Sequence, residues 1–580
     1  MNKIIKYKYW WVGLVALFVT IIYLCKFLRY RVDLTAEKRF SISNSTKTLL
    51  ENIDSMVTIK LFLTGDLPAD YRKLSNAAQD LLSEFRDISN NLVKVTVETP
   101  GAGLPDSSKM QLYDSLERIG VPFDRNEDVS AANNKTTNQI IIPAALVYYK
   151  NHMPFVVDLR SSRKVFKNFN VLNDVPQEDK EATLNAAEAL LEFKFTNAID
   201  KLTRSFVPTV AYAVGNGEPI DHTVTDLGES LRNDYRLGVF NLKASYPNPQ
   251  QIDALLIVKP SQPFTDEDKL KIDQYVMHGG KIIWFVDKLY AELDSLMRSQ
   301  ADFVAFDRNL NLDDILFKYG VRINGDLVQD LNCSKIPIVI GQNPDGSPRM
   351  QRIPWPYYPF LSSPNNNPIS KNLDRVLPIF PSSIDTVKAP GIQKTILLTS
   401  DTNSRTLSSP AMVSIKSIGD IDFQTFNKSY IPVAVLLEGK FTSLFANRLT
   451  KQVQDSVARA LGKPFAPVAD NDTKQIVVSD ADIVTNEISS TAGPLPMGQL
   501  PLENYRFANR EFFLNSVDYM VSTSGIFELR NKDLTLRLLD KKKVEDQKNT
   551  WQLINIVLPV IIIILFGLVY QWNRKRKFSL

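Results

Sequence analysis

A short glycine-containing segment, Gly215, Asn216, Gly217 and Glu218, directly follows the apolar run TVAYAV, which is typical of a buried strand. Open α/β sheets bind ligands beyond the carboxyl ends of their strands, so this loop is a candidate ligand-binding site. Asp287 follows a second apolar run, KIIWFV, and belongs to the same candidate set. The competing interpretation is a tight turn whose glycines adopt positive φ.

Signatures of catalysis are missing from the sequence. No G-x-x-x-x-G-K-[ST] run occurs, and the nearest fragment, ALGKP at 460–464, lacks both the upstream glycine and the hydroxyl residue. Cys333 has no histidine after it, since the last one is His278, and a nucleophile needs an activating base within reach. We therefore predict no ATP hydrolysis, no cofactor and no enzymatic activity.

Several aspartates end predicted strands and have the chemistry of metal ligands: Asp287, Asp401, Asp480 and Asp482. Strand-terminal aspartate more often caps the following turn or helix. The three histidines and two cysteines also lack the spacing of a zinc site. The sequence therefore predicts no metal centre.

The elements that would position these residues alternate between strands and helices. From residue 208 onward, continuous apolar strands alternate with amphipathic helices, which predicts a doubly wound sheet covered on both faces. Upstream, TIKLFLTG, a helix over 71–90 and LVKVTVETP predict a β-α-β unit, followed by surface loops over 101–138. A hairpin in ALVYYKNHMPFVVDL and a helix over 181–202 complete this first module.

Two apolar spans lie near the ends of the chain, at 10–28 and 551–572. Each is long enough to cross a hydrocarbon core of roughly 30 Å as a helix. The second span precedes four cations at 574–577, which favour a cytoplasmic end. We therefore expect a two-pass membrane protein with both termini in the cytoplasm and the large middle region exported. In a Gram-negative cell this would be an inner-membrane protein with a periplasmic region; otherwise the region would be extracellular.

Charge supports this layout. Fourteen of the 68 basic residues but only two of the 64 acidic residues lie in 1–31 and 541–580, which leaves a net formal charge of −8 on residues 32–540. An acidic exported region is a poor nucleic-acid binder. Cys25 lies inside a predicted span, so a disulfide with Cys333 is not expected.

The second span carries two amide side chains near its outer end. Gln552 and Asn555 lie three residues apart and share one helix face, where they could bond a neighbouring membrane helix. Solvation of both amides at the membrane interface is the alternative. We retain Gln552 and Asn555 as candidate docking residues.

The predicted domain organisation has four parts. Residues 1–30 form the first anchor, and 31–205 form an exported α/β domain. Residues 206–540 form a second α/β domain with an irregular, exposed insertion near 340–375, which is rich in proline and asparagine. Residues 541–580 form the second span and its basic tail.

Several long segments carry a family resemblance: SISNSTKTLLENID, DALLIVKPSQPFTDEDKLKIDQYVMHGGKIIWFVD, NLDDILFKYGVRINGDLVQD, PVAVLLEGKFTS, QIVVSDADIVTNE and NREFFLNSVDYMVSTSGIFELRNKDLTLRLLD. In this order they resemble the GldG family, auxiliary subunits of gliding-motility-associated ABC transporters of Bacteroidota. The resemblance implies a substrate-binding-like subunit that works with a separate permease and a separate cytoplasmic ATPase. It also implies a second domain similar in fold to class I glutamine amidotransferases, here without the Cys and His of that chemistry.

The sequence thus predicts a non-catalytic, membrane-anchored subunit that docks on a permease and binds a ligand or an envelope protein. Two alternatives stay open. One is a structural linker that couples the transporter to envelope machinery for motility or secretion. The other is an exported amidase-like hydrolase, which would need a nucleophile that the sequence does not reveal.

Overall fold

The computed structural model describes residues 41–129, 136–161, 163–164, 180–292, 302–342, 344, 346, 348–415, 422–489, 491–501, 505–522, 525–531 and 541–578, with 13, 15–20 and 23 near the N-terminus. The chain divides into two compact units, Met1–Asp533 and Leu534–Leu580.

The first sheet of unit 1 has four strands in the order β2-β1-β5-β6: β1 (Val57–Leu61), β2 (Val93–Val97), β5 (Ala144–Tyr149) and β6 (Phe155–Asp158). β1 and β2 are parallel, whereas β5 pairs antiparallel with both β1 and β6. Helix α3 (Ala69–Ile88) connects β1 to β2 and buries Leu74, Ala78, Leu82 and Phe85, which share one face at helical spacing. The predicted β-α-β unit and the predicted hairpin are both confirmed.

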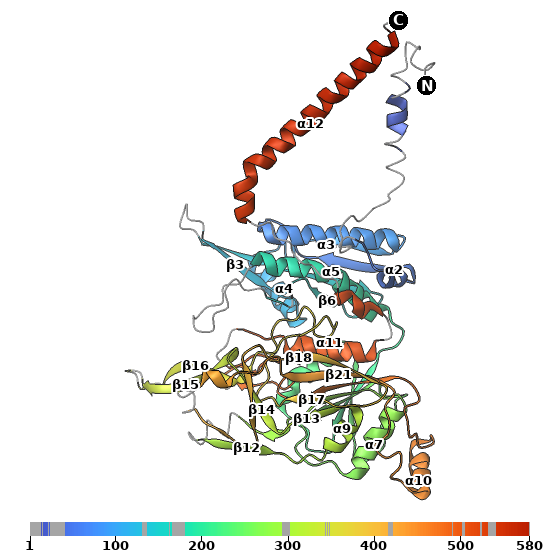
Figure 1. The fold of residues 1–580 in the computed structure, drawn as a ribbon, viewed down its shortest axis with the longest axis vertical. Coiled ribbons are helices and arrows are strands. Elements are labelled where there is room, and N and C mark those ends of the chain that lie inside the picture. The colour runs from blue at the N-terminus through green and yellow to red at the C-terminus, as the bar shows by residue number, and fades with distance from the viewer. Residues whose placement is uncertain are drawn as a thin grey trace. The chain divides into compact units, whose positions relative to one another are not determined.

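Helix α5 (Lys180–Thr203) lies beside α3 (Figure 1). Its residues Leu191, Phe195 and Ile199 are buried in the core of the four-stranded sheet. Phe193 instead belongs to the core of the following sheet and packs edge-on against Phe527, with ring centroids 5.7 Å apart. Because α5 buries side chains on two sides, it is a structural element shared by two cores.

The second sheet of unit 1 has seven strands in the order β18-β21-β22-β10-β9-β7-β8. β7 (Thr209–Val214), β8 (Arg236–Asn241), β9 (Ala254–Val258), β10 (Ile282–Phe285) and β22 (Thr473–Val478) are parallel. β21 (Pro432–Gly439) and β18 (Ile392–Thr399) add antiparallel strands at one edge. The later segments TILLTS, PVAVLLEG and QIVVSDADIV therefore belong to the same sheet.

Helices cover both faces of this sheet. α6 (Thr225–Arg232) and α11 (Asn509–Val521) pack in one core, and α7 (Asp266–Met277) and α9 (Asp313–Tyr319) pack in the other. Figure 1 shows α11 above β18 and β21, with α9 and α7 below them. The coarse prediction of a mixed α/β architecture is confirmed.

The remaining elements of unit 1 are α2 (Asn44–Glu51), α4 (Asp106–Arg118), α10 (Lys451–Leu461), η2 (His222–Val224), η4 (Phe423–Thr425), η5 (Gly525–Asn531), β3 (Asp124–Val129), β4 (Thr136–Ile141), β11 (Leu289–Tyr290), β12 (Phe303–Asp307), β13 (Val321–Ile323), β14 (Asp326–Asp330), β15 (Cys333–Gln342), β16 (Pro348–Pro359), β17 (Ile384–Thr386), β19 (Ser404–Ser408), β20 (Ala411–Val413), β23 (Ile488–Ser489) and β24 (Gly493–Pro494).

The predicted irregular insertion near 340–375 is wrong in part. β15 and β16 form a long antiparallel hairpin there, and Trp355, Tyr358 and Leu361 are buried. Proline removes a backbone donor, but only alternate N–H groups of an edge strand face its partner, so a two-stranded hairpin tolerates several prolines. The aromatic residues between the prolines supply the apolar surface that anchors the segment.

The prediction of surface loops over 101–138 is also wrong in part. This stretch contains α4 and the paired strands β3 and β4. Leu116 of α4 and Val121 are buried in a small satellite core against Phe62. The abundant polar residues hid this element because α4 buries only a narrow face.

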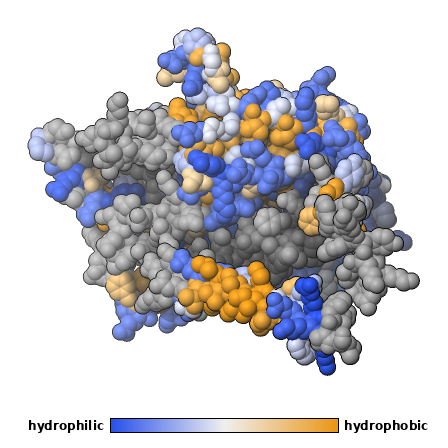
Figure 2. Space-filling model, turned by 90° about the horizontal axis from the view of Figure 1, so that it is seen from above, coloured by the Kyte–Doolittle hydropathy of each residue, from blue (hydrophilic) through white to orange (hydrophobic). Residues whose placement is uncertain are grey.

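Unit 2 is dominated by α12 (Lys541–Phe578). Its segment Thr550–Arg576 is long and apolar enough to cross a membrane, which agrees with the predicted span at 551–572. In Figure 2 the apolar side chains of this helix form a continuous orange stretch that ends in blue basic residues. Of the predicted span at 10–28, residues 13, 15–20 and 23 are helical, and the rest lies outside the described residues.

Candidate functional site

The carboxyl ends of four parallel strands bring the predicted site residues to one edge of the seven-stranded sheet. Gly215 follows β7, Lys259 follows β9, Asp287 follows β10, and Asp480 follows β22. α6 and α7, which follow β7 and β9, pack in the cores on opposite faces. The loops after β7 and β9 therefore flank a topological switch point.

The loop at 215–218 is closed by a hydrogen bond within itself and by others from the loop after β9. The Asn216 backbone N–H donates to Glu218 Oε2 at 2.7 Å, and Ser261 Oγ donates to the Gly217 carbonyl at 2.9 Å. Gly217 has φ +78°, and a Cβ there would lie 2.2 Å from Ser261 Oγ. The geometry thus has the features of the tight turn, and binding by this loop stays a prediction.

Two acceptor oxygens of the same loop are buried without a partner, Asn216 Oδ1 and Glu218 Oε1. Burial raises the pKa of Glu218, although backbone N–H groups of the loop oppose that rise. Neither residue lines the cavities of about 800 Å³ and about 970 Å³ that lie among the described residues of unit 1.

Asp287 lies in a cluster of three carboxylates. Oxygens of Asp287, Asp480 and Asp482 lie within 4.8 Å of one another. The ammonium of Lys259 contacts Asp482 and lies 3.7 Å from Asp287 Oδ2. Since this ammonium already supplies a positive charge to the cluster, we assign no metal ion to it.

Backbone donors hold the same carboxylates in place. The Ile379 N–H donates to Asp480 Oδ2 at 2.8 Å, and the Ala481 N–H donates to Asp287 Oδ1 at 2.6 Å. Burial, with the repulsion of Asp482, raises the pKa of Asp480 well above its usual range. Asp287 therefore has a structural partner in Lys259. The sequence pattern did not single out Lys259, because this lysine lies at the end of an apolar strand with no motif around it.

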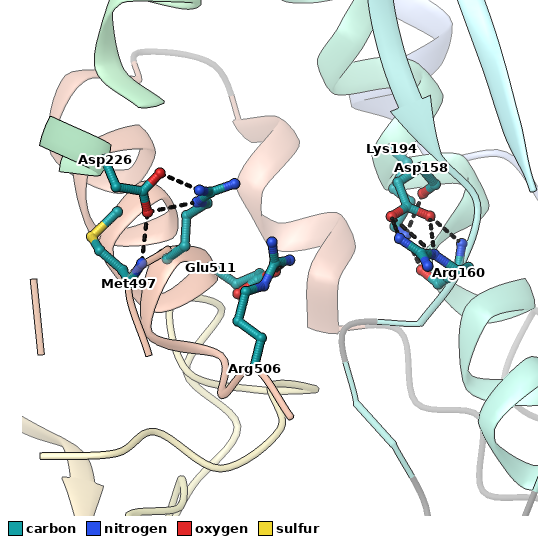
Figure 3. A network of polar contacts seen from close by, with 8 residues as sticks. Asp158, Arg160, Lys194, Asp226, Met497, Arg506 and Glu511 are labelled. Carbon is teal, nitrogen blue, oxygen red and sulfur yellow. Dashed lines mark hydrogen bonds and ion pairs between the residues drawn. The ribbon is translucent and has the colours of Figure 1, made fainter. Parts of the chain in front are cut away.

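A second site lies between α5 and the start of α11, at a cavity of about 970 Å³. Such a volume is at the upper end of the range of about 300–1,000 Å³ for small-molecule sites. Figure 3 shows two groups of charged side chains around it, Asp158, Arg160 and Lys194 on one side and Arg506 and Glu511 on the other. The sequence analysis missed this cavity because its residues come from segments more than 300 positions apart.

On the first side, the cations are bound to protein groups. Arg160 Nη2 donates to Asp158 Oδ2 at 2.8 Å, and its Nη1 donates to Asp124 Oδ1 at 2.9 Å. Lys194 Nζ donates to the carbonyl oxygen of Asp158 at 2.6 Å and to that of Arg160. Burial lowers the pKa of Lys194 to about 8.

On the second side, Arg506 Nη2 donates to Glu511 Oε1 at 3.0 Å. Glu511 lies in the first turn of α11, where a carboxylate is stabilised by the helix dipole. Its second oxygen, Oε2, is buried without a hydrogen-bond partner. Nearby, Arg510 contacts Asp226, which also accepts from the Met497 N–H at 2.7 Å.

With this geometry established, comparisons with known proteins place the chain. Residues 207–516, more than half of the chain, match the ABC transport auxiliary family described as "ABC-type uncharacterized transport system". The chain belongs to this family. Residues 36–148 match a domain of unknown function.

A relative from Borreliella burgdorferi, described as an "Uncharacterized protein", is 19% identical over 566 residues. The alignment covers 94% of this chain and 94% of the relative. Among solved structures, the mmIFT52 N-terminal domain is 11% identical, with 54% of this chain and 97% of that chain covered and a TM-score of 0.30. A ThuA-like protein from Parabacteroides merdae is 9% identical, with 58% and 93% covered and a TM-score of 0.23.

Within this auxiliary family member, Cys333 has the surroundings of a core residue. It is 3% exposed, and burial raises the pKa of its thiol to about 12. A thiol with this pKa is not a nucleophile at neutral pH.

We expect Cys333→Ser to keep full transport-related function, with a stability loss on the order of 1–2 kcal/mol from a buried hydroxyl. Titration with a thiol reagent should label Cys333 in the unfolded wild-type chain but not in the folded chain. Rapid labelling of the folded chain, together with loss of function in the variant, would instead indicate a reactive thiol.

Proposed function

We propose that this chain is a non-catalytic, membrane-anchored subunit of an ABC-type transport system that docks on the permease through its membrane helices. The family match over 207–516 carries the proposal. The apolar helix with its basic end supports membrane anchoring. The proposed topology is two-pass, with the domains at 31–205 and 206–540 in the periplasm and the ATPase on the cytoplasmic side.

The finer features rest on the resemblance to the GldG family. They are a role in gliding motility and a second domain of amidotransferase-like fold that has lost its catalysis. The buried, high-pKa thiol of Cys333 disfavours the hydrolase alternative. A structural linker to envelope machinery would share the same anchors and differ in its partner.

The polar face of α12 supports docking. Gln552 and Asn555 lie on one face of this helix with Pro559, which falls four residues after Asn555. Proline has no N–H, so the Asn555 carbonyl loses its usual donor within the helix. In a bilayer, such a freed carbonyl and the two amides favour a neighbouring helix with hydrogen-bond donors.

The experiment is copurification of the permease from mild detergent. Replacing 557–570 with an unrelated leucine-rich span should preserve membrane insertion and abolish copurification. A sharper variant, Gln552→Leu with Asn555→Leu, should reduce recovery of the permease about tenfold, since two interhelical hydrogen bonds of about 0.6 kcal/mol or more each are lost.

The matched control is Val557→Ala with Ile561→Ala, two residues four apart on the opposite side of the same helix. It should leave permease recovery unchanged. Unchanged recovery in both the leucine-span variant and the Gln552→Leu/Asn555→Leu variant would mean that α12 is a passive anchor and that the docking proposal is wrong.

A further inference from the structure

Strand β8 is an edge strand of the seven-stranded sheet, and one of its sides is open. It pairs with β7 alone, in parallel and in unbroken register over its whole length. The Arg236 N–H donates to the Pro208 carbonyl at 3.0 Å. In a parallel pair every second residue bonds to the neighbouring strand, so the backbone groups of Leu237 and Val239 point away from β7. Among the described residues, no hydrogen bond reaches those outward groups.

The side chains of β8 leave room for a further strand. Val239 is 72% exposed, although it is apolar and lies in the middle of the strand. Gly238 beside it faces open space, because a Cβ there would meet no heavy atom within 4 Å apart from its chain neighbours. Leu237 and Phe240 are half-buried and pack in the cores on opposite faces of the sheet. An exposed apolar edge of this kind is a template for pairing with another chain.

Two other sheet edges of unit 1 are protected against such pairing. At the opposite end of the seven-stranded sheet, Thr399 of β18 exchanges two backbone hydrogen bonds of 3.0 Å with Ser362. At the edge of the four-stranded sheet, β2 carries the exposed Lys94, and a lysine on an edge strand discourages pairing. β8 has no lysine, proline or bulge, and no segment in the described part of the chain covers it.

The charge along β8 indicates what kind of segment fits the edge. Arg236 is exposed and has no ion-pair partner among the described residues, whereas Lys243, after the strand, is engaged by Asp268 at 2.5 Å. No acidic residue occurs over 235–246. A second copy of β8 would therefore bring no anion to Arg236, whereas an acidic segment of another protein would supply one.

We propose that β8 binds an extended, acidic segment of a partner protein, which adds to the seven-stranded sheet as an antiparallel eighth strand. The backbone groups of Leu237 and Val239 exchange hydrogen bonds with the segment. Residues opposite each other in a sheet share a face, so the segment carries a carboxylate opposite Arg236 and a β-branched residue opposite Val239. A large aromatic side chain opposite Gly238 fills the open space there. This surface is additional to the docking of α12 and does not depend on it.

The test is peptide binding to the full-length chain in mild detergent, without permease, read by fluorescence anisotropy. The probe is a labelled synthetic peptide, TVFVETS, whose residues V, F, V and E match positions 239, 238, 237 and 236 in antiparallel order. The comparison peptide, TVFVKTS, has lysine in place of glutamate, and micelles without protein set the baseline. Wild-type protein should bind TVFVETS about tenfold more tightly or better, because one peptide pairs with Arg236 and the other repels it.

Two variants test the two halves of the contact. Arg236→Glu should weaken binding of TVFVETS about tenfold or more and should bind TVFVKTS instead. Val239→Pro removes one outward N–H and should abolish binding, whereas the fold should persist because an edge strand tolerates proline where its N–H faces away from the sheet. Lys94→Glu is the matched control, since Lys94 is an exposed lysine on another edge strand, and it should leave binding unchanged. Circular dichroism checks the fold of each variant.

Four results would overturn the inference. The first two are no binding of TVFVETS to wild-type protein and equal binding of the two peptides. The third is a loss in Lys94→Glu as large as that in Arg236→Glu, which would reduce the effect to overall charge. The fourth is a wild-type dimer in light scattering that Val239→Pro dissociates, which would assign the edge to a second copy of this chain. None of these results bears on copurification of the permease.

Discussion

Replacing Lys201 with methionine is expected to destabilise unit 1 by about 3–5 kcal/mol, the cost of removing one partner from a buried ion pair. The Lys201 side chain is 8% exposed, and its Nζ lies 2.5 Å from Asp234 Oδ2 and 3.1 Å from Asp518 Oδ1. Burial opposes the charge of Lys201, but the two carboxylates outweigh it and raise the pKa of the ammonium. Without the ammonium, two nearly buried carboxylates would lose their common partner.

The measurement is urea unfolding followed by intrinsic fluorescence. Lys73→Met is the matched control, because Lys73 is a 59% exposed lysine that pairs with Glu188 of α5 at 3.3 Å. It should cost less than about 1 kcal/mol, as exposed ion pairs do. Adding Asp234→Asn and Asp518→Asn to Lys201→Met should recover part of the lost stability. Equal losses in Lys201→Met and Lys73→Met would contradict a buried ion pair at Lys201.

This ion pair also has a consequence for the cavity. Lys201 belongs to α5 and Asp518 to α11, the two helices between which the cavity lies. Tyr235 donates to Asp518 as well, so one carboxylate connects three elements. The Lys201–Asp518 ion pair therefore holds α5 against α11 beside the cavity.

Replacing Lys259 with methionine is the second change with a large expected effect, about 3–5 kcal/mol at neutral pH. Its ammonium is the positive charge beside Asp287, Asp480 and Asp482. Burial already raises the pKa of Asp287 and of Asp480 above the usual range for aspartate. Removing the ammonium would raise them further, because each carboxylate would keep its like-charged neighbours and lose its counter-charge.

The sign of the pH dependence follows from these raised pKa values. An acid whose pKa is higher in the folded chain stabilises the fold below its unfolded pKa, and this contribution is lost as pH rises through the folded pKa. The deficit of Lys259→Met in thermal stability should therefore be smaller at about pH 5 than at about pH 8. Lys60→Met, which removes a 38% exposed lysine, should show a small deficit at both pH values.

The outcome also decides the role of Asp287. A large, pH-dependent deficit assigns this carboxylate and Lys259 to the structure of the sheet edge. If Lys259→Met is as stable as wild type at both pH values, the cluster is not held by the ammonium, and a ligand-binding role for Asp287 gains support.

Local signals in the sequence were sufficient for many elements of the fold. Thr265 caps α7 through a reciprocal pair of hydrogen bonds with Asp268, and Ser43 caps α2, as their positions before apolar helical patterns indicate. The apolar helix near the C-terminus was predictable because its length and composition alone define a span. The carboxyl-edge position of Gly215 and Asp287 was predictable because parallel strands end at one edge.

The tertiary structure decided what those residues contact. Asp287 meets Lys259, Asp480 and Asp482 only because β9, β10 and β22 are neighbours, an order that no local pattern specifies. The prolines of β16 led to the prediction of an irregular segment for the same reason. Whether a strand tolerates proline depends on which of its N–H groups face a partner strand.

The cavity was the least predictable feature. In the sequence, Arg506 and Glu511 are two charged residues without a motif around them, and Lys194 is one of many lysines. These three residues line one cavity only because α5 is packed between two cores and brought opposite α11. Sequence by itself determines local conformation and the apolar helix near the C-terminus, because both depend on neighbouring residues. Burial, hydrogen bonding and electrostatic partners depend on residues hundreds of positions apart, and therefore only the tertiary structure decides them.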